Sequence, residues 1–335
     1  QTEPKSKIQL GLRLGKWYGE NLDRPEYAQP YYAMVMELDP NNVQVRRRVA
    51  AIYRLGGNWQ AVGEELTRAL NVAVANDDRK IVLHELGELL EKNMGQVDQG
   101  LTFYKRALEV DQLFMPTLES LERIYDEQGK HQELAEILAL KVKALEEPAQ
   151  VAQHKLRLAA LHEDQLNNLD TAARTFREVL DIEAGNIVAL RGLERIYGTT
   201  RAWPELVNVL EQQLDVVDTE RERVDALLKL AGIQEEQFLK PDLAAQRFEQ
   251  ALEIDVAEMR AYEGLERCYR RLKQWLDLVN TYERHIAELL EVDKKVELYF
   301  QIAQIYQEEV GDVQCAVDAY RNIVELDEGN IPAHE

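Results

Sequence analysis

This sequence of 335 residues lacks several features that would mark other protein classes. It has only two cysteines, Cys268 and Cys315, without metal or redox spacing, which excludes a disulfide framework and favours a reducing compartment. No apolar run reaches the length of a membrane span, so we predict no direct membrane span. We expect a cytoplasmic location, with a periplasmic or membrane-complex-associated one as the alternatives. With 17 Gly, 9 Pro and no alternating apolar strands, the composition is that of a soluble, nearly all-helical protein.

Positive charge is also scarce. Lys and Arg number 40 against 61 Asp and Glu, which gives a formal net charge of −21. Such a charge repels phosphate backbones, and no basic run is longer than Arg46-Arg47-Arg48, so we expect no nucleic-acid binding. An acidic surface favours basic or mixed-charge protein segments as partners. The alternative is that the acidic residues only keep the helix faces solvated.

What the sequence does contain is a repeat of 72 residues, visible in independent series. The first series is Tyr53, Tyr125, Tyr197 and Tyr269, and the second is Trp59, His131, Trp203 and Trp275. A third is Tyr32, Tyr104, Phe176, Phe248 and Tyr320, and a fourth is Asp39, Asp111, Glu183, Asp255 and Asp327. No insertion disturbs these intervals. A fixed period of this kind predicts a solenoid, in which each unit buries its apolar face by stacking on its neighbours.

One period contains four helical patterns, which form two antiparallel hairpins. Between residues 184 and 255, we expect Gly198-Thr199-Thr200-Arg201 to end the first helix and Trp203-Pro204 to begin the second. Asp218-Thr219-Glu220 supplies caps for the third helix, and Pro241 starts the fourth. A further proline, Pro30, lies inside a predicted helix and should kink it or delay its start.

The hairpin with the Tyr32 series resembles the tetratricopeptide repeat (TPR). Its first helix carries a Leu-Gly or similar pair (Leu14-Gly15, Leu86-Gly87, Leu158-Ala159, Leu230-Ala231, Ile302-Ala303). Its second helix carries a small residue (Ala28, Gly100, Ala172, Ala244, Ala316) four residues before the aromatic one. Two departures from the family pattern stand out: the turn is one residue longer, and Glu122, Glu194 and Glu266 occupy a packing position in the other hairpin.

The resemblance implies an all-α fold, a right-handed α-α superhelical solenoid of about nine TPR-like hairpins. We expect one continuous solenoid over residues 1–335, part of a longer array, because the repeat is uncapped at both ends. The expected hairpins are approximately 5–40, 44–75, 77–111, 116–147, 149–183, 188–219, 221–255, 260–291 and 293–327.

Catalytic motifs are not recognisable in this sequence. It has no Gly-rich phosphate loop, nucleophile elbow or zinc-protease helix, and its six His lack partners for a metal set. His131 replaces a Trp of its series and is expected to be a packing residue. We therefore predict a protein that is not an enzyme and binds no cofactor or metal.

The resemblance further implies that the first helix of each hairpin lines a concave face. The candidate partner-binding residues on that face are Arg47, Arg123, Arg191, Arg195, Arg267, Glu91, Glu163 and Glu235. One interpretation is that the arginines grip an extended peptide or a helix through its carboxylates or carbonyls. The other is that each arginine neutralises an adjacent Glu or the Glu in a packing position of a neighbouring repeat, as strict repetition favours.

The sequence thus favours a non-catalytic protein-protein interaction scaffold that organises partner proteins or peptides within a larger complex. Two alternatives remain open. The chain could be a self-assembling structural component that associates through its uncapped ends. It could also be the targeting region of a larger enzyme or of a secretion or motility apparatus.

Overall fold

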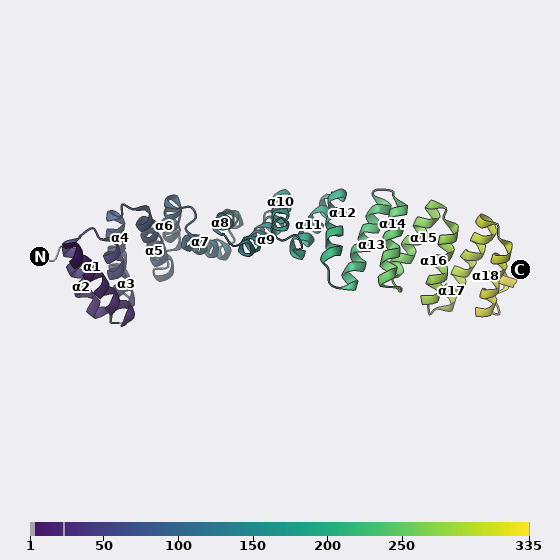
Figure 1. Ribbon diagram of the computed structural model, residues 1–335, viewed down its shortest axis with the longest axis horizontal. Helices are drawn as coiled ribbons and strands as arrows, with labels where there is room; N and C mark the ends of the chain where they lie inside the picture. Colours follow the sequence, from purple (N-terminus) through teal and green to yellow (C-terminus); the bar gives the residue numbers. More distant parts are fainter. Residues whose placement is uncertain (1–3, 23, 335) are drawn as a thin grey trace. The chain divides into compact units, whose positions relative to one another are not determined.

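The structure is a computed structural model that describes residues 4–22 and 24–334, and all regular structure in these ranges is helical. The predicted all-α class is confirmed. The chain divides into two compact units, Gln1–Asn168 and Leu169–Glu335. Each unit is a row of antiparallel helical hairpins (Figure 1).

The helices of the first unit alternate between first and second members of hairpins. They are α1 (Pro4–Lys16), α2 (Pro25–Leu38), α3 (Val43–Leu55), α4 (Trp59–Val72), α5 (Asn76–Glu88), α6 (Val97–Val110), α7 (Met115–Glu127), α8 (His131–Ala144) and α9 (Pro148–Asp164). π-Helical turns at Trp17–Asn21 and Leu89–Asn93 extend α1 and α5. Helix α2 begins at Pro25 and contains Pro30, so the proline does not delay its start.

The second unit continues the same alternation. Its helices are α10 (Leu169–Leu180), α11 (Ile187–Thr200), α12 (Trp203–Val216), α13 (Glu220–Glu236), α14 (Pro241–Ile254), α15 (Met259–Leu272), α16 (Trp275–Glu288), α17 (Val292–Gln304), α18 (Val313–Leu326) and α19 (Ile331–His334). A π-helical turn at Ile305–Val310 extends α17. The unit boundary lies between α9 and α10, so the fifth predicted hairpin contributes one helix to each unit.

The Tyr32 series forms the centre of the hairpin packing. Tyr32, Tyr104, Phe176 and Phe248 are at most 3% exposed. Each ring lies against a glycine, and a Cβ on that glycine would approach ring carbons to between 2.3 and 2.6 Å. Along the chain, the glycine comes before the aromatic residue for the two tyrosines (Gly15, Gly87). It comes after the aromatic residue for the two phenylalanines (Gly192, Gly264). Helices approach closely here because these glycines have no side chain.

The Tyr53 and Trp59 series mark the turn of the other hairpin. The backbone N–H of Asn58, Lys130, Ala202 and Gln274 donates to the carbonyl of Tyr53, Tyr125, Tyr197 and Tyr269, respectively, at 2.9–3.0 Å. One residue before each donor is left-handed: Gly57, Gly129, Arg201 and Lys273, with φ between 56° and 69°. This closure ends the first helices of these hairpins within one residue of the same position in the repeat.

The expectation that Gly198-Thr199-Thr200-Arg201 ends the helix is confirmed. Helix α11 continues through Gly198 to Thr200, and the chain reverses at Arg201 with φ 57°. The turn falls at Arg201 because this residue occupies the position in the repeat that Gly57 and Gly129 occupy in earlier periods. The expected starts at Trp203 and Pro241 are confirmed, and Thr219 caps α13 by accepting from the N–H of Glu222 at 3.2 Å.

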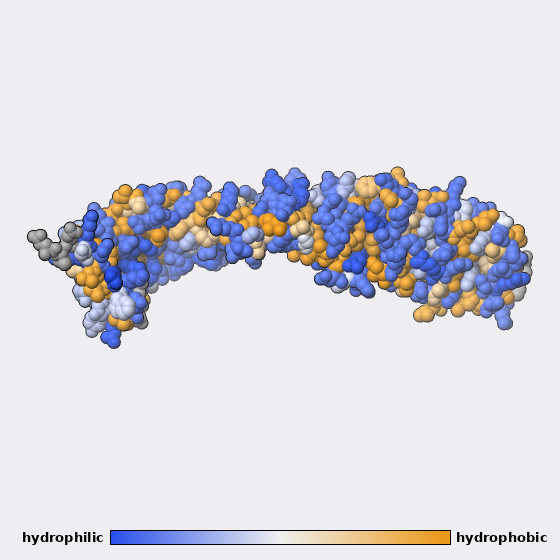
Figure 2. All heavy atoms as spheres, in the orientation of Figure 1, coloured by the Kyte–Doolittle hydropathy of each residue, from blue (hydrophilic) through white to orange (hydrophobic). Residues whose placement is uncertain are grey.

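The additional residue in the TPR-like turn has a structural counterpart. In the hairpins of the Tyr32 series, the chain leaves the first helix through a wide turn, in which an N–H donates to a carbonyl six residues earlier. Gln96 to Leu90 and Lys240 to Gln234, both 2.8 Å, are examples. Among the described residues, a left-handed residue lies at the same register in four of these turns: Gly95, Asn167, Leu239 and Gly311. Figure 2 shows that the visible face of each unit is mostly hydrophilic, with hydrophobic patches among the helices.

Candidate functional site

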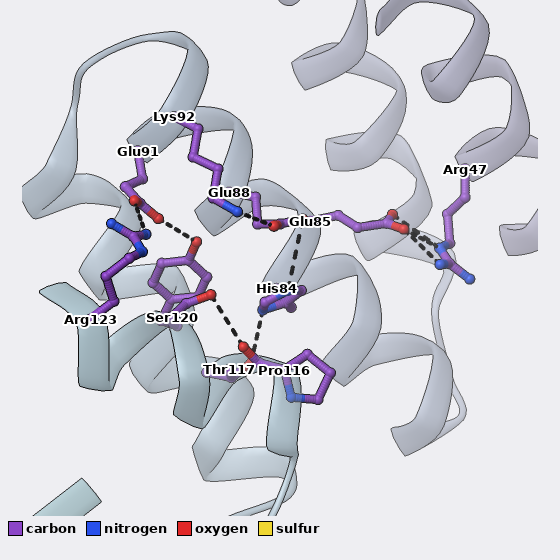
Figure 3. A network of polar contacts seen from close by, with 11 residues as sticks. Arg47, His84, Glu85, Glu88, Glu91, Lys92, Pro116, Thr117, Ser120 and Arg123 are labelled. Atoms are coloured by element: carbon purple, nitrogen blue, oxygen red, sulfur yellow. Dashed lines mark hydrogen bonds and ion pairs between the residues drawn. The ribbon is translucent and has the colours of Figure 1, made fainter.

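The first helices α3, α5 and α7 of the first unit carry a connected set of polar side chains (Figure 3). Arg47 on α3 forms a two-pronged ion pair with Glu85 on α5, with N–O distances of 2.6–3.1 Å. This hydrogen bonding raises the pKa of Arg47. The pair lines a hollow of about 330 Å³ together with Gln44, Arg48 and Ala51. The candidate Arg47 is therefore ordered by its neighbouring hairpin and borders accessible space.

Glu91 lies at the centre of the second part of this network. Its side chain is only 7% exposed, and it accepts hydrogen bonds from the Tyr104 hydroxyl at 2.8 Å and from Arg123 on α7. Arg123 also contacts Glu127 at 3.3 Å. The bond to Glu91 raises the pKa of Arg123, and burial followed by the bond to Glu91 raises the pKa of Tyr104. Two candidate residues, Glu91 and Arg123, thus pair with each other across adjacent hairpins.

His84 lies beside this network and is 9% exposed. Its Nδ1 is 3.1 Å from the Thr117 hydroxyl on α7, and its Nε2 is 3.7 Å from Glu88, which also accepts from Lys92. Burial lowers the pKa of His84 despite the neighbouring carboxylates of Glu88, Glu85 and Glu91. The histidine is therefore neutral near pH 7 and connects α5 to α7 through a neutral contact.

The second unit repeats the pattern with other members of the same series. Arg267 on α15 holds Glu235 on α13 through Nε and Nη2 at 3.0–3.3 Å, and Arg191 on α11 pairs with Glu222 on α13. Arg195 on α11 and Glu163 on α9 belong to different units, and both interact with neighbouring groups. The structure thus brings together the candidate pairs Arg123–Glu91 and Arg267–Glu235, which are both 32 residues apart.

Sequence reasoning missed these pairings. It assigned each arginine either to a partner peptide or to a nearby glutamate, whereas the observed acid lies on the first helix of an adjacent hairpin. This is the preceding hairpin for Arg123 and Arg267 and the following hairpin for Arg47 and Arg191. Glu85 and Glu222 were not considered as partners at all. The sequence does show that Arg123 and Arg267 recur at the same interval as Glu91 and Glu235, but this recurrence alone does not show that the side chains meet.

The packing-position glutamates have partners of their own. Glu122 is 9% exposed and accepts from Lys141 and Arg157, while Glu194 accepts from Lys229 and from Gln213 at 2.9 Å. Glu266 pairs with Arg270 at 3.2 Å. These glutamates are tolerated at a helix-packing position because each has a Lys or Arg partner that compensates its charge.

No catalytic arrangement emerges from the described residues. They contain no group of three or more His, Cys, Asp or Glu side chains placed to bind a metal ion, and none of their helices combines the length and apolarity of a membrane span. Cys268 is fully buried, and burial raises the pKa of its thiol to about 12. Such a thiol is inert near neutral pH.

Comparison with known proteins agrees with the repeated hairpin. The tetratricopeptide repeat family model TPR_7 matches residues 189–224, which comprise most of α11, all of α12 and the start of α13. The chain therefore contains a tetratricopeptide repeat over these residues. TPR proteins in general are non-catalytic scaffolds for protein–protein interaction. The comparison with curated proteins gives no match.

Several solved structures match this chain. YrrB, a TPR protein with an unusual peptide-binding site, has 14% identity over 55% of this chain and 90% of that chain, with a TM-score of 0.35. The structure of Naa15/Naa10 bound to HypK-THB has 15% identity over 99% of this chain and 60% of that chain, with a TM-score of 0.47. The C-terminal part of a TPR repeat-containing protein from Cytophaga hutchinsonii has 14% identity over 96% and 97%, with a TM-score of 0.37.

Proposed function

We propose that this protein is a non-catalytic scaffold that organises partner proteins or peptides within a larger complex, using the faces formed by its first helices. The observation that carries the proposal is a set of arginines, found in both units, that are ordered by ion pairs yet remain exposed to solvent. The side chains of Arg123, Arg191 and Arg267 are 43%, 50% and 53% exposed. Each therefore combines a fixed position with accessible N–H donors.

The geometry of the ion pairs explains how they could serve binding. Arg267 uses Nε and Nη2 to hold Glu235, and Nη1 takes no part in this pair. A guanidinium held in this way loses little further side-chain entropy when it donates to a carbonyl or carboxylate of a bound segment. The chain's net charge of −21 favours partners with basic or mixed-charge segments, since these approach an acidic surface most readily.

The test is an affinity capture from native lysate with the full chain as bait, followed by binding measurements with the captured partner. Changing Arg123, Arg191 and Arg267 together to Gln removes the ordered donors. The matched control is Arg321→Gln on α18, a second helix, where the arginine contacts Asp318 at 2.9 Å. We expect the triple variant to weaken partner binding at least about tenfold and the control to leave it unchanged.

Two results would contradict this proposal. One is equal partner affinity for the triple variant and the unchanged chain, with intact helicity. The other is the absence of any captured partner together with a light-scattering mass that rises with concentration, which would favour the self-assembling alternative.

A further inference from the structure

The second unit contains an apolar recess of about 300 Å³ between α11, α12 and α13. Trp203, Leu206, Leu210 and Ile233 form its apolar lining, and Gly198 and Gly232 also line it. A Cβ added to either glycine would meet no atom within 4 Å, so the space beside both residues is open. A binding site is the kind of feature that breaks a structural repeat, and several residues that line this recess differ from those of the next period.

The next period of the same chain fills the corresponding space with its own side chains. Leu210, Gly198 and Gly232 are replaced there by Tyr282, Arg270 and Gln304, while the lining residues recur as Trp275, Leu278 and Ile305. The Tyr282 ring is 1% exposed. Its hydroxyl donates to Gln301 at 2.6 Å and accepts from Arg270 at 2.9 Å. Tyr282 thus shows which chemical group fits this position in the hairpin: a phenol with its apolar ring enclosed.

The opening of the recess has a cause in the sequence. In the period before it, Asp126 and Arg157 form an ion pair at 3.0 Å across the equivalent position, and in the period after it Arg270 bonds Gln301 at 2.8 Å. Gly198 takes the place of Asp126 and Arg270, so Lys229 has no opposite side chain at that register. Lys229 instead pairs with Glu194 and forms one wall of the recess.

We propose that this recess binds an aromatic side chain of a partner peptide that carries a Lys or Arg beside it. The ring occupies the position that Tyr282 fills in the next period. The basic neighbour faces a rim with two acids, Glu194 and Glu236, against one base, Lys229. The recess is the specificity-determining part of the interaction face, so this inference rests on the proposed scaffold function.

The experiment is selection of a random peptide display library on the full chain, followed by affinity measurements with the enriched peptides. Two variants fill the recess with the larger side chains that the next period has at the same positions. They are Leu210→Tyr and Gly232→Gln. Gly232→Gln keeps the proposal testable if the buried Leu210→Tyr variant does not fold, because the space beside Gly232 is open. The matched control is Ala160→Gln, at the same register on α9 in the first unit.

Enriched peptides are expected to share an aromatic residue next to Lys or Arg. Their affinity should fall about tenfold or more in both recess variants, and by a similar factor when the peptide's aromatic residue becomes Ala. The Ala160→Gln control should bind normally, and far-UV circular dichroism should be unchanged in all three variants.

Three outcomes would overturn the inference. Peptides that bind both recess variants as tightly as the unchanged chain would refute the recess but leave the scaffold function standing. A dimer of the chain that Gly232→Gln dissociates would show that the occupant is a second copy. Failure to enrich any peptide counts against the recess, and together with an empty lysate capture it would refute the scaffold function as well.

Discussion

The contact between Gly264 and Phe248 gives the sharpest test of how the hairpins pack. A Cβ at Gly264 would lie 2.3, 2.4 and 2.6 Å from three carbons of the Phe248 ring, where carbon atoms prefer about 3.5–4.0 Å. The ring is 3% exposed and enclosed by buried residues of α13, α14 and α15, so it has little room to withdraw. Gly264→Ala therefore introduces overpacking at the centre of the unit.

The expected cost follows from two opposing effects. Overpacking in a closed core costs about 1–3 kcal/mol, and three short contacts place this site at the upper end. Alanine regains about 1 kcal/mol through its better helix propensity. We expect a net loss of about 2 kcal/mol in the free energy of unfolding. Gly232→Ala is the matched control, because it meets no atom within 4 Å and should stabilise the chain by about 0.5–1 kcal/mol.

The assay is urea unfolding of the full chain followed by circular dichroism, with hydrogen exchange of α14 and α15 to locate the change. In a background of Phe248→Leu the ring is gone, so Gly264→Ala should then no longer destabilise. Equal stability of Gly264→Ala and Gly232→Ala would refute the packing argument.

Four further predictions follow from individual residues. Arg267→Gln should destabilise by about 2 kcal/mol because it leaves Glu235, 4% exposed, without its ion pair; a double-mutant cycle with Glu235→Gln should show the coupling, and additive effects would contradict it. Since burial lowers the pKa of His84, the folded state binds fewer protons than the unfolded one, and stability should be complete above about pH 6.5 and decline as the pH falls below it; urea midpoints of His84→Gln should depend less on pH over this range. Leu239→Gly should raise the melting temperature, because Leu239 adopts φ 54° at a 66% exposed position; a lower melting temperature would refute this. Cys268 should resist a thiol reagent at about pH 8 until the chain is unfolded, and rapid labelling of the native protein would contradict its burial.

Much of the fold could be predicted from strict repetition. Tyr53 and its series gave the period, and the resulting helices begin at Trp203 and Pro241 as expected. The stretch Gly198-Thr199-Thr200-Arg201 ends its helix as expected, but the sequence did not single out which of these residues makes the turn. Glycine disfavours helices, yet Gly198 remains inside α11 and the chain turns at Arg201. The hydrogen bond from the N–H of Ala202 to the carbonyl of Tyr197 fixes the turn there.

The candidate site could be predicted only in part. The sequence indicated which arginines lie on the first helices, because their interval of 72 residues places them at one register. It did not indicate that Arg123 and Arg267 bind Glu91 and Glu235, since contacts between hairpins depend on how far adjacent helices are offset. Nor did composition distinguish Gly264, which meets a ring, from Gly232, which borders open space.

The sequence by itself therefore determined the helices, their order and the residues that recur in the packing, because periodicity acts within and between neighbouring segments of the chain. Tertiary structure alone decided which charges pair across hairpins and where the repeated surface opens. The physical reason is that side-chain pairing and empty space depend on distances of a few ångströms between helices. A recess can open when Gly198 and Leu210 stand where the next period has Arg270 and Tyr282.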